Sequence, residues 1–261
     1  MPKKAKPSRK KMIIDADTHI SPTGGEFSVE KHLERMARAG IDKTLVWLRP
    51  DYEGTGIEGH NKYIYDAVQK YPDKLIGFGW ADPTVSVKHA LKMVRICTEE
   101  YGFYGVKMNG AQNHYYIDDP ELGLPVAEAI AGTGKAIAFH IGPDEYERTH
   151  PFRAAKIARM FPETPVLMVH MGMTNVDLNN AVIEMALECP NMALVGSATT
   201  YKAILQAIET LGASRVCFGT DAPFQWPHVV RAMYNSALEG EVTQKEKSLV
   251  MGGNIARILK L

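Results

Sequence analysis

The chain has 261 residues, of which 45% are hydrophobic, and its 30 lysine and arginine residues equal its 30 aspartate and glutamate residues. This length suits a single α/β domain, and the apolar fraction is sufficient for a large core. A neutral balance of charge gives no overall field that would attract nucleic acid or a membrane surface, so neither is expected as a partner. The sequence contains no apolar run near the ~20 residues that span a bilayer.

Residues 1–11 differ from the rest of the chain. They hold six lysine and arginine residues and two prolines, without an acidic residue. Such a segment cannot bury apolar surface, so we expect a disordered basic tail ahead of one catalytic domain over residues 12–261. The segment also lacks the apolar centre of a secretory signal.

Three cysteines, Cys97, Cys189 and Cys217, lie far apart and within apolar segments. Their spacing does not match a metal-binding pattern. We therefore expect buried, reduced thiols and a cytoplasmic location.

From Met12 onward, short apolar runs alternate with amphipathic stretches. Eight runs of four to six residues are typical of strands buried on both faces, and they span 12–15, 44–48, 75–80, 105–108, 136–140, 166–170, 193–196 and 216–219. Helical patterns lie between them, among others at 87–98, 151–160, 177–187 and 201–211. This alternation predicts an α/β fold of the (β/α)8 TIM-barrel type. An open doubly wound sheet is the alternative, but its glycine-rich phosphate turn is missing.

The first helix illustrates the pattern. Ser28 is a natural N-cap, and Gly40 is suited to end the helix. Leu33 and Met36 follow at core spacing together with Ala37. His32 is expected on the exposed face of this helix.

The first apolar run is followed by a polar triplet. Side chains alternate along a strand, so Asp15, Asp17 and His19 share one face. Burying these groups is costly unless a metal or partner charges neutralise them. We expect Asp17 and His19 to be neighbouring metal ligands, with Asp15 deeper and orienting them. The alternative is a polar strand end that frays into the following loop.

Other strand ends carry matching residues. Two runs end in the pattern apolar–His–apolar–Gly, at His140 and His170, and the last run is followed by Asp221. The carboxyl ends of barrel strands gather at one face, so these side chains should meet Asp17 and His19 there. Taken singly, each histidine could be a hydrogen-bonded core residue, and Asp221 could form an Asx turn or a helix cap.

This donor set contains nitrogen and oxygen but no thiolate. Such a set suits one divalent ion, either Zn²⁺ or, where carboxylates dominate, Mn²⁺ or Fe²⁺. An ion of this kind acidifies bound water and polarises carbonyl oxygens. The combination of residues is more specific than any one of its parts.

With these motifs in place, the chain resembles the metal-dependent amidohydrolase superfamily. It is most similar to the branch that contains aminocarboxymuconate-semialdehyde decarboxylase and the γ-resorcylate decarboxylases. The resemblance covers 12–261, in family order, through I-D-A-D-T-H at 14–19, G-V-K-M at 105–108, H-I-G at 140–142, H-M-G at 170–172, F-G-T-D at 218–221 and G-N-I-A-R-I-L at 253–259.

The resemblance implies a site for one metal ion. In it, Asp17, His19, His140 and Asp221 match the family's ligands, and His170 matches its acid or base, or a further ligand. The common motif is H-x-H, and Asp17 stands in its first place. A carboxylate at this place favours Mn²⁺ more than two histidines would. The resemblance also implies a homodimer.

Lys107 is the penultimate residue of the fourth run. Related amidohydrolases carry a carbamylated lysine there that bridges two metals, but the G-V-K-M context is more similar to the one-metal branch. We expect Lys107 to bind a substrate anion or to form a buried ion pair. Asn109, His114 and Arg49 follow strands and are the other candidate substrate-binding residues. Alternatively the first two belong to a packed surface loop, and Arg49 pairs with Asp51.

The leading functional hypothesis is hydrolysis of a small ester, lactone or amide-like substrate by metal-activated water, with His170 and Asp221 moving protons. The alternative is non-oxidative decarboxylation of a small unsaturated or aromatic carboxylic acid. A related metal-dependent nuclease would need basic stripes around the site, which a neutral chain argues against. A barrel that only binds a ligand would not need the metal-binding residues. A serine hydrolase is disfavoured because G-x-S-x-G is missing.

Overall fold

The computed structural model describes residues 12–49 and 56–261. The expected tail over residues 1–11 and Asp51 lie outside the described residues. Every pair of neighbouring strands is parallel. The strands are β1 (Ile14–Ile20), β2 (Lys43–Leu48), β3 (Leu75–Gly77), β4 (Gly79–Trp80), β5 (Gly105–Met108), β6 (Ala136–His140), β7 (Val166–Val169), β8 (Met192–Val195) and β9 (Val216–Cys217).

The strands form two sheets, β1-β2-β3 and β4-β5-β6-β7-β8-β9. Phe78 connects β3 to β4, and its N–H donates to the carbonyl of Val46 on β2 over 3.0 Å. The predicted run over residues 75–80 is therefore one strand with a break at Phe78. The two sheets are consecutive parts of a single ring.

Backbone hydrogen bonds between β1 and the segment that directly follows β9 close this ring. The N–H of Ala16 donates to Phe218 over 2.9 Å, and the N–H of His19 donates to Ala222 over 2.7 Å. The N–H of Asp221 donates in turn to the carbonyl of Asp17. The fold is the predicted (β/α)8 TIM barrel.

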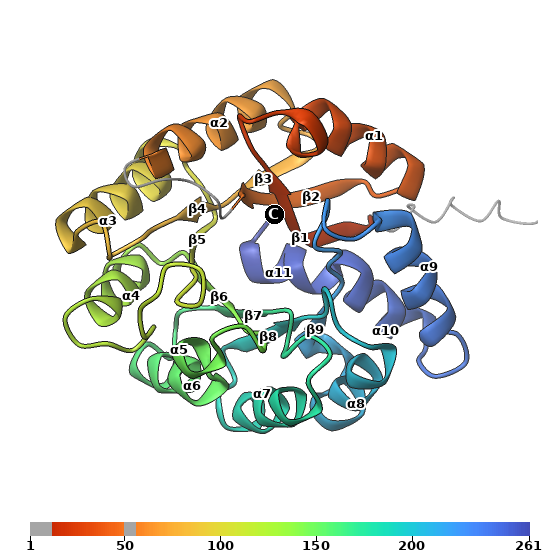
Figure 1. Cartoon of the computed structure of the whole chain (residues 1–261). Helices are drawn as coiled ribbons and strands as arrows, with labels where there is room; N and C mark the ends of the chain where they lie inside the picture. The colour runs from red at the N-terminus through yellow and green to blue at the C-terminus, as the bar shows by residue number, and fades with distance from the viewer. Residues whose placement is uncertain (1–11, 50–55) are drawn as a thin grey trace, which may run out of the picture.

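Helices surround the strands, and Figure 1 shows α1 to α9 as an outer ring. The π-helical turn Leu249–Gly253 and α11 contact β1 and β9, and Gly252 lies against the start of β1. The α-helices are α1 (Val29–Ala39), α2 (Ile57–Lys70), α3 (Val87–Arg95), α4 (Gly123–Gly132), α5 (Tyr146–Thr149), α6 (Pro151–Met160), α7 (Val176–Glu188), α8 (Tyr201–Leu211), α9 (Pro227–Ala237), α10 (Gln244–Ser248) and α11 (Asn254–Leu259).

The ends of α1 are those predicted. The side chain of Ser28 accepts a hydrogen bond from the N–H of Lys31, and Gly40 ends the helix with φ of 63°. The predicted core face is partly wrong. Ala37 is exposed, whereas His32 is buried. His32 is accommodated because its Nε2 lies 2.8 Å from the hydroxyl of Thr44, which satisfies a polar atom inside the core.

The interior agrees with the composition. The described strands are buried along almost their whole length, as both faces of a barrel sheet require. Cys97, Cys189 and Cys217 are free and buried, which confirms the prediction of buried thiols. Among the described residues, helices that combine the length and the apolar character needed to cross a membrane are not found.

Candidate metal centre at the barrel mouth

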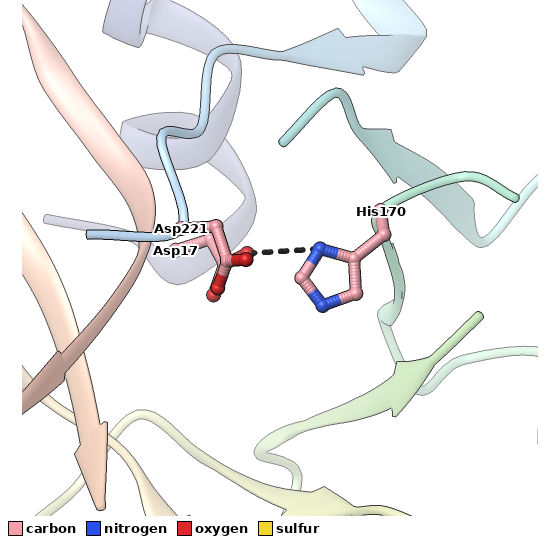
Figure 2. Close-up of side chains that lie close together, drawn as sticks. All are labelled: Asp17, His170 and Asp221. Atoms are coloured by element: carbon pink, nitrogen blue, oxygen red, sulfur yellow. Dashed lines mark ion pairs between the residues drawn. The ribbon is translucent and has the colours of Figure 1, made fainter. Parts of the chain in front are cut away.

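Three buried side chains meet at the carboxyl ends of the strands. Asp17 belongs to β1, His170 directly follows β7, and Asp221 follows β9. One potential ligand atom from each lies within 4.8 Å of the others. Figure 2 shows the ring of His170 facing the two carboxylates. This arrangement can hold a divalent cation, because two carboxylates and an imidazole are common metal ligands.

Two of these residues adopt an uncommon backbone conformation. The φ angle is 70° at His170 and 60° at Asp221, in the left-handed region that favours glycine. Non-glycine residues are held there only when the surrounding structure stabilises them, and such residues concentrate at functional sites. The two turns direct both side chains into the mouth of the barrel.

Asp17 has one engaged and one free carboxylate oxygen. Its Oδ2 accepts a hydrogen bond from the hydroxyl of Ser197 and lies 3.3 Å from Nδ1 of His170. Its Oδ1 is buried without a hydrogen-bond partner among the residues described. Buried carboxylate oxygens are normally hydrogen-bonded, so this atom fits direct contact with a cation.

Ser197 determines which nitrogen of His170 carries a proton. The hydroxyl of Ser197 gives its hydrogen to Asp17, so it accepts from Nδ1 of His170 over 2.9 Å. The proton of a neutral His170 therefore resides on Nδ1. Its Nε2 keeps a lone pair that can bind a metal or accept a proton.

His19 lies beside the three-residue group. Its Nε2 is 3.8 Å from Oδ1 of Asp17 and 3.5 Å from Oδ1 of Asp221. The same nitrogen accepts a hydrogen bond from the indole N–H of Trp47, while Nδ1 lies 2.7 Å from the carbonyl of Leu48. His19 is therefore close enough to join the site, but its unprotonated nitrogen, Nε2, already accepts a hydrogen bond from Trp47.

His140 hydrogen-bonds to Asp144, which lies outside the three-residue group. Its ring packs edge-on against that of His170, with the ring centroids 4.7 Å apart. Its Nε2 lies 2.8 Å from the carboxylate of Asp144, and this bond, despite the opposing effect of burial, keeps the pKa of Asp144 below its ordinary value. Of the four expected ligands, Asp17 and Asp221 are brought together, His19 lies next to them, and His140 is bonded to Asp144.

Asp15 occupies the deeper position that was expected of an orienting residue. It accepts hydrogen bonds from the backbone N–H and the hydroxyl of Thr220, over 2.9 and 2.6 Å, and from the N–H of Asp17 over 3.2 Å. These bonds connect the Asp17 strand to the turn that carries Asp221. Burial raises the pKa of Asp15 to about 8.

Burial dominates the electrostatics of the site. It raises the pKa of Asp17, against the effect of the Lys107 ammonium, and raises the pKa of Asp221 to about 6. Burial also lowers the pKa of His19 to about 3 and that of His170 well below its ordinary value. Both imidazoles are therefore neutral at neutral pH, as metal binding requires.

Lys107 introduces a positive charge beside the carboxylates. Its side chain is buried, and Nζ lies 3.9 Å from the ring centroid of Trp47 and 5.3 Å from that of Trp80. Burial lowers the pKa of Lys107, whereas the carboxylates of Asp17 and Asp221 oppose this shift. A cation held against aromatic faces near a cavity mouth is a suitable binding group for an anion.

The other candidate substrate-binding residues have local contacts. Asn109 is buried and accepts from the N–H of Gln112 over 3.0 Å, within a turn. The side chain of His114 is 68% exposed and lies 2.9 Å from Glu145. The guanidinium of Arg49 lies 4.3 Å above the ring of Phe27.

Three residues that contact the site were not predicted. From the sequence, Trp47, Asp144 and Ser197 were expected to have no role in the site. Trp47 is the penultimate residue of β2, and Ser197 comes two residues after β8 ends. The rule that selected His170, a polar group at the end of a barrel strand, would have selected Ser197 as well.

Comparisons with known proteins identify the family and support the fold. The sequence model of the family described as Amidohydrolase matches residues 14–261. Among curated proteins a sequence match is not found. The fold is similar to 5-carboxyvanillate decarboxylase from Sphingomonas paucimobilis, with 19% identity, a TM-score of 0.77, and coverage of 97% of this chain and 100% of that chain.

Two further solved structures are similar. For 2,6-dihydroxybenzoate decarboxylase from Rhizobium, the identity is 16%, the TM-score 0.77, and the coverage 96% of this chain and 99% of the other. A 5-carboxyvanillate decarboxylase from Novosphingobium aromaticivorans, complexed with manganese and 4-hydroxy-3-methoxy-5-nitrobenzoic acid, has 16% identity, a TM-score of 0.78 and 96% coverage of both chains.

Proposed function

The chain belongs to the amidohydrolase family, and we propose that it is a metal-dependent, non-oxidative decarboxylase of a small aromatic or unsaturated carboxylic acid. The observation that carries the proposal is the unpartnered, buried Oδ1 of Asp17 within the group formed with His170 and Asp221. A cation would stabilise a buried anionic oxygen of this kind, and a divalent ion fits the donors that surround it.

Asp17, Asp221 and His170 would hold the ion, with His19 adjacent. Manganese suits the two carboxylates, and zinc suits the imidazole nitrogens. The similar decarboxylase from Novosphingobium aromaticivorans was crystallised with manganese, which supports the same choice here. When bound, a divalent ion supplies a Lewis acid that polarises oxygen atoms of the substrate.

Lys107 is suited to bind the carboxylate that the substrate loses. Its ammonium lies near the carboxylates of Asp17 and Asp221 and against the ring of Trp47. A substrate anion placed there would gain a charge-assisted hydrogen bond from the ammonium. The indole faces around this group would exclude water from the site.

Asp221 is suited to deliver the proton that the reaction consumes. Loss of CO₂ breaks a carbon–carbon bond and leaves its electron pair on the ring or alkene carbon, which must then gain a proton. Burial raises the pKa of Asp221 to about 6 in the metal-free protein, and a carboxylate that holds the ion through one oxygen keeps a second oxygen that can carry a proton. Neutral His170 keeps its proton on Nδ1, toward Ser197, and so has its Nε2 lone pair available for the ion.

Decarboxylation is preferred here to the hydrolysis that the sequence favoured. The similar structures include decarboxylases of carboxyvanillate and dihydroxybenzoate, which supports the reading that the sequence ranked second. A hydrolase would use the same donors, so the products distinguish the two reactions. A homodimer, implied by the resemblance, is a separate proposal that analytical ultracentrifugation tests.

The test is a product assay on protein reconstituted with Mn²⁺ or with Zn²⁺. A panel of hydroxylated benzoates carrying a ¹³C-labelled carboxylate and a panel of aryl lactones are incubated in D₂O. We expect labelled CO₂ from a benzoate and one deuterium on the product carbon that bore the carboxylate. The matched variant Asp221→Asn keeps the shape but cannot supply a proton, so it should lose turnover per bound ion, with the metal content of each preparation measured by elemental analysis. Lactone opening without CO₂ release would instead establish hydrolysis.

A further inference from the structure

The hydrogen bonds of His19 fix its protonation. A carbonyl oxygen can only accept, so Nδ1 of His19, 2.7 Å from the carbonyl of Leu48, carries the proton. An indole nitrogen can only donate, so Nε2, which lies 3.1 Å from Nε1 of Trp47, is the acceptor. The single lone pair of this imidazole is therefore occupied by Trp47.

The same nitrogen faces the candidate metal centre. Nε2 lies 3.5 Å from Oδ1 of Asp221 and 3.8 Å from Oδ1 of Asp17. The oxygens of an ionised carboxylate can only accept, so neither hydrogen-bonds to this nitrogen, whereas a cation between them would contact both. Nε2 is thus the atom of His19 through which a metal ion would be bound, and it is the atom that Trp47 engages.

We propose that Trp47 competes with the divalent ion for Nε2 of His19 and so sets the metal affinity of the site. This inference rests on the proposed metal centre. In the metal-free protein the indole N–H satisfies the buried lone pair. Metal binding through His19 breaks this hydrogen bond, and its loss reduces the net free energy of metal binding.

Packing keeps Trp47 in the competing position. Its side chain is fully buried, its ring lies edge-on to Phe78, and Nζ of Lys107 lies 3.9 Å from the ring centroid. Phenylalanine at this position would keep an aromatic face for Lys107 while removing the N–H. The variant Trp47→Phe therefore isolates the competing hydrogen bond.

The experiment titrates Zn²⁺ into the purified metal-free protein by calorimetry. We expect Trp47→Phe to bind Zn²⁺ about tenfold more tightly than the wild type, because its metal-free state leaves the Nε2 lone pair buried and unsatisfied. Trp80→Phe is the matched control. Trp80 also borders Lys107, but its N–H donates to Asn113 over 3.0 Å, so this variant should keep the wild-type affinity.

A double-mutant cycle assigns the effect to His19. Asn at position 19 retains a donor near the position of Nδ1 but has no atom at the position of Nε2. In the His19→Asn background, Trp47→Phe should leave the affinity for Zn²⁺ unchanged. Equal tightening in both backgrounds, or no tightening in either, would overturn the competition.

A second measurement observes Trp47 directly in the wild-type protein. The chain has three tryptophans, so the ¹⁵N-labelled wild type has three indole N–H signals, and the spectrum of Trp47→Phe identifies the one from Trp47. We expect Zn²⁺ to shift this signal and to speed its hydrogen exchange, as the imidazole acceptor is lost. Zn²⁺ binding that leaves this signal in place would reject the competition and retain the metal centre. A wild type that binds no Zn²⁺ would reject both.

Discussion

Ser197 donates a hydrogen bond to Oδ2 of Asp17, and the two residues are 180 positions apart in the chain. The same hydroxyl accepts from Nδ1 of His170. One small side chain therefore fixes the orientation of a carboxylate and the proton position of an imidazole. Groups that orient metal ligands in this way affect metal affinity without touching the ion.

Replacing Ser197 with alanine should weaken metal binding. Asp17 loses a hydrogen bond, and the buried Nδ1–H of His170 loses its acceptor, so we expect Ser197→Ala to bind Zn²⁺ about tenfold to a hundredfold more weakly. Thr199→Ala is the control, since the Thr199 hydroxyl donates to the backbone carbonyl of Met173 and not to a side chain of the site described here. Equal Zn²⁺ affinities for the wild type and Ser197→Ala would mean that the hydrogen bonds of Ser197 to Asp17 and His170 do not influence metal binding.

Asp17→Asn should have opposite effects on stability and on metal binding. Burial raises the pKa of Asp17, which means that its charge is costly in the fold. Removing the charge should raise the melting temperature of the metal-free protein. It should also abolish the further rise that Zn²⁺ or Mn²⁺ gives the wild type, because ligand stabilisation requires affinity. Thermal unfolding with and without each ion measures both effects.

For Asp17→Asn, elemental analysis provides the independent check. Wild-type protein dialysed against Mn²⁺ should retain about one ion per chain, as a single buried site predicts. The variant should retain far less. Retention of a full equivalent by Asp17→Asn would place the ion elsewhere.

The architecture could be predicted because barrel strands leave a strong signal. Strands buried on both faces need continuous apolar runs, and the runs at 105–108 and 136–140 coincide with β5 and β6. The predicted ends were less accurate where other forces decide them. The backbone at His170 turns into the left-handed region, so β7 ends at Val169. On α1, His32 enters the core because Thr44 offers it a partner, which helical spacing alone cannot reveal.

The positions of the candidate site residues could be predicted better than their contacts. Strand-end residues Asp17 and Asp221 meet as expected, because the ring brings the first and last strands together. The partner of each nitrogen depends on side-chain torsion and on residues from other strands. Asp144 and Trp47 therefore engage His140 and His19 in ways that spacing along the chain does not encode.

Lys107→Met should separate substrate binding from metal binding. Removing the ammonium takes away a charge-assisted hydrogen bond to the substrate anion, worth about 1.5–3 kcal/mol, so we expect KM for a benzoate substrate to rise by about tenfold or more. The same change removes a cation beside Asp17 and Asp221, so Zn²⁺ should bind more tightly. Steady-state kinetics and calorimetry measure the two effects.

Lys135→Met is the matched control for this substitution. Lys135 also lies over an aromatic ring, 5.7 Å from the centroid of Tyr104, but it precedes β6 at the opposite end of the barrel. Its loss should leave KM and Zn²⁺ affinity at their wild-type values. If Lys107→Met kept the wild-type KM, the role of anion anchor would have to be assigned to another residue.

Buried His32 should make stability depend on pH. Burial, assisted by the charge of Arg35, lowers the pKa of His32 from 6.5 to about 3. Between these values the unfolded chain binds a proton that the folded chain does not, so the free energy of unfolding falls as pH drops below 6.5. Between pH 7 and pH 5 the loss from His32 should be about 2 kcal/mol.

Urea unfolding of wild type and His32→Gln at both pH values isolates this contribution, because His19 and His170 act equally in both proteins. His114→Gln, which changes an exposed imidazole, should follow the wild type. Parallel pH curves for wild type and His32→Gln would mean that the folded protein accommodates a charged His32.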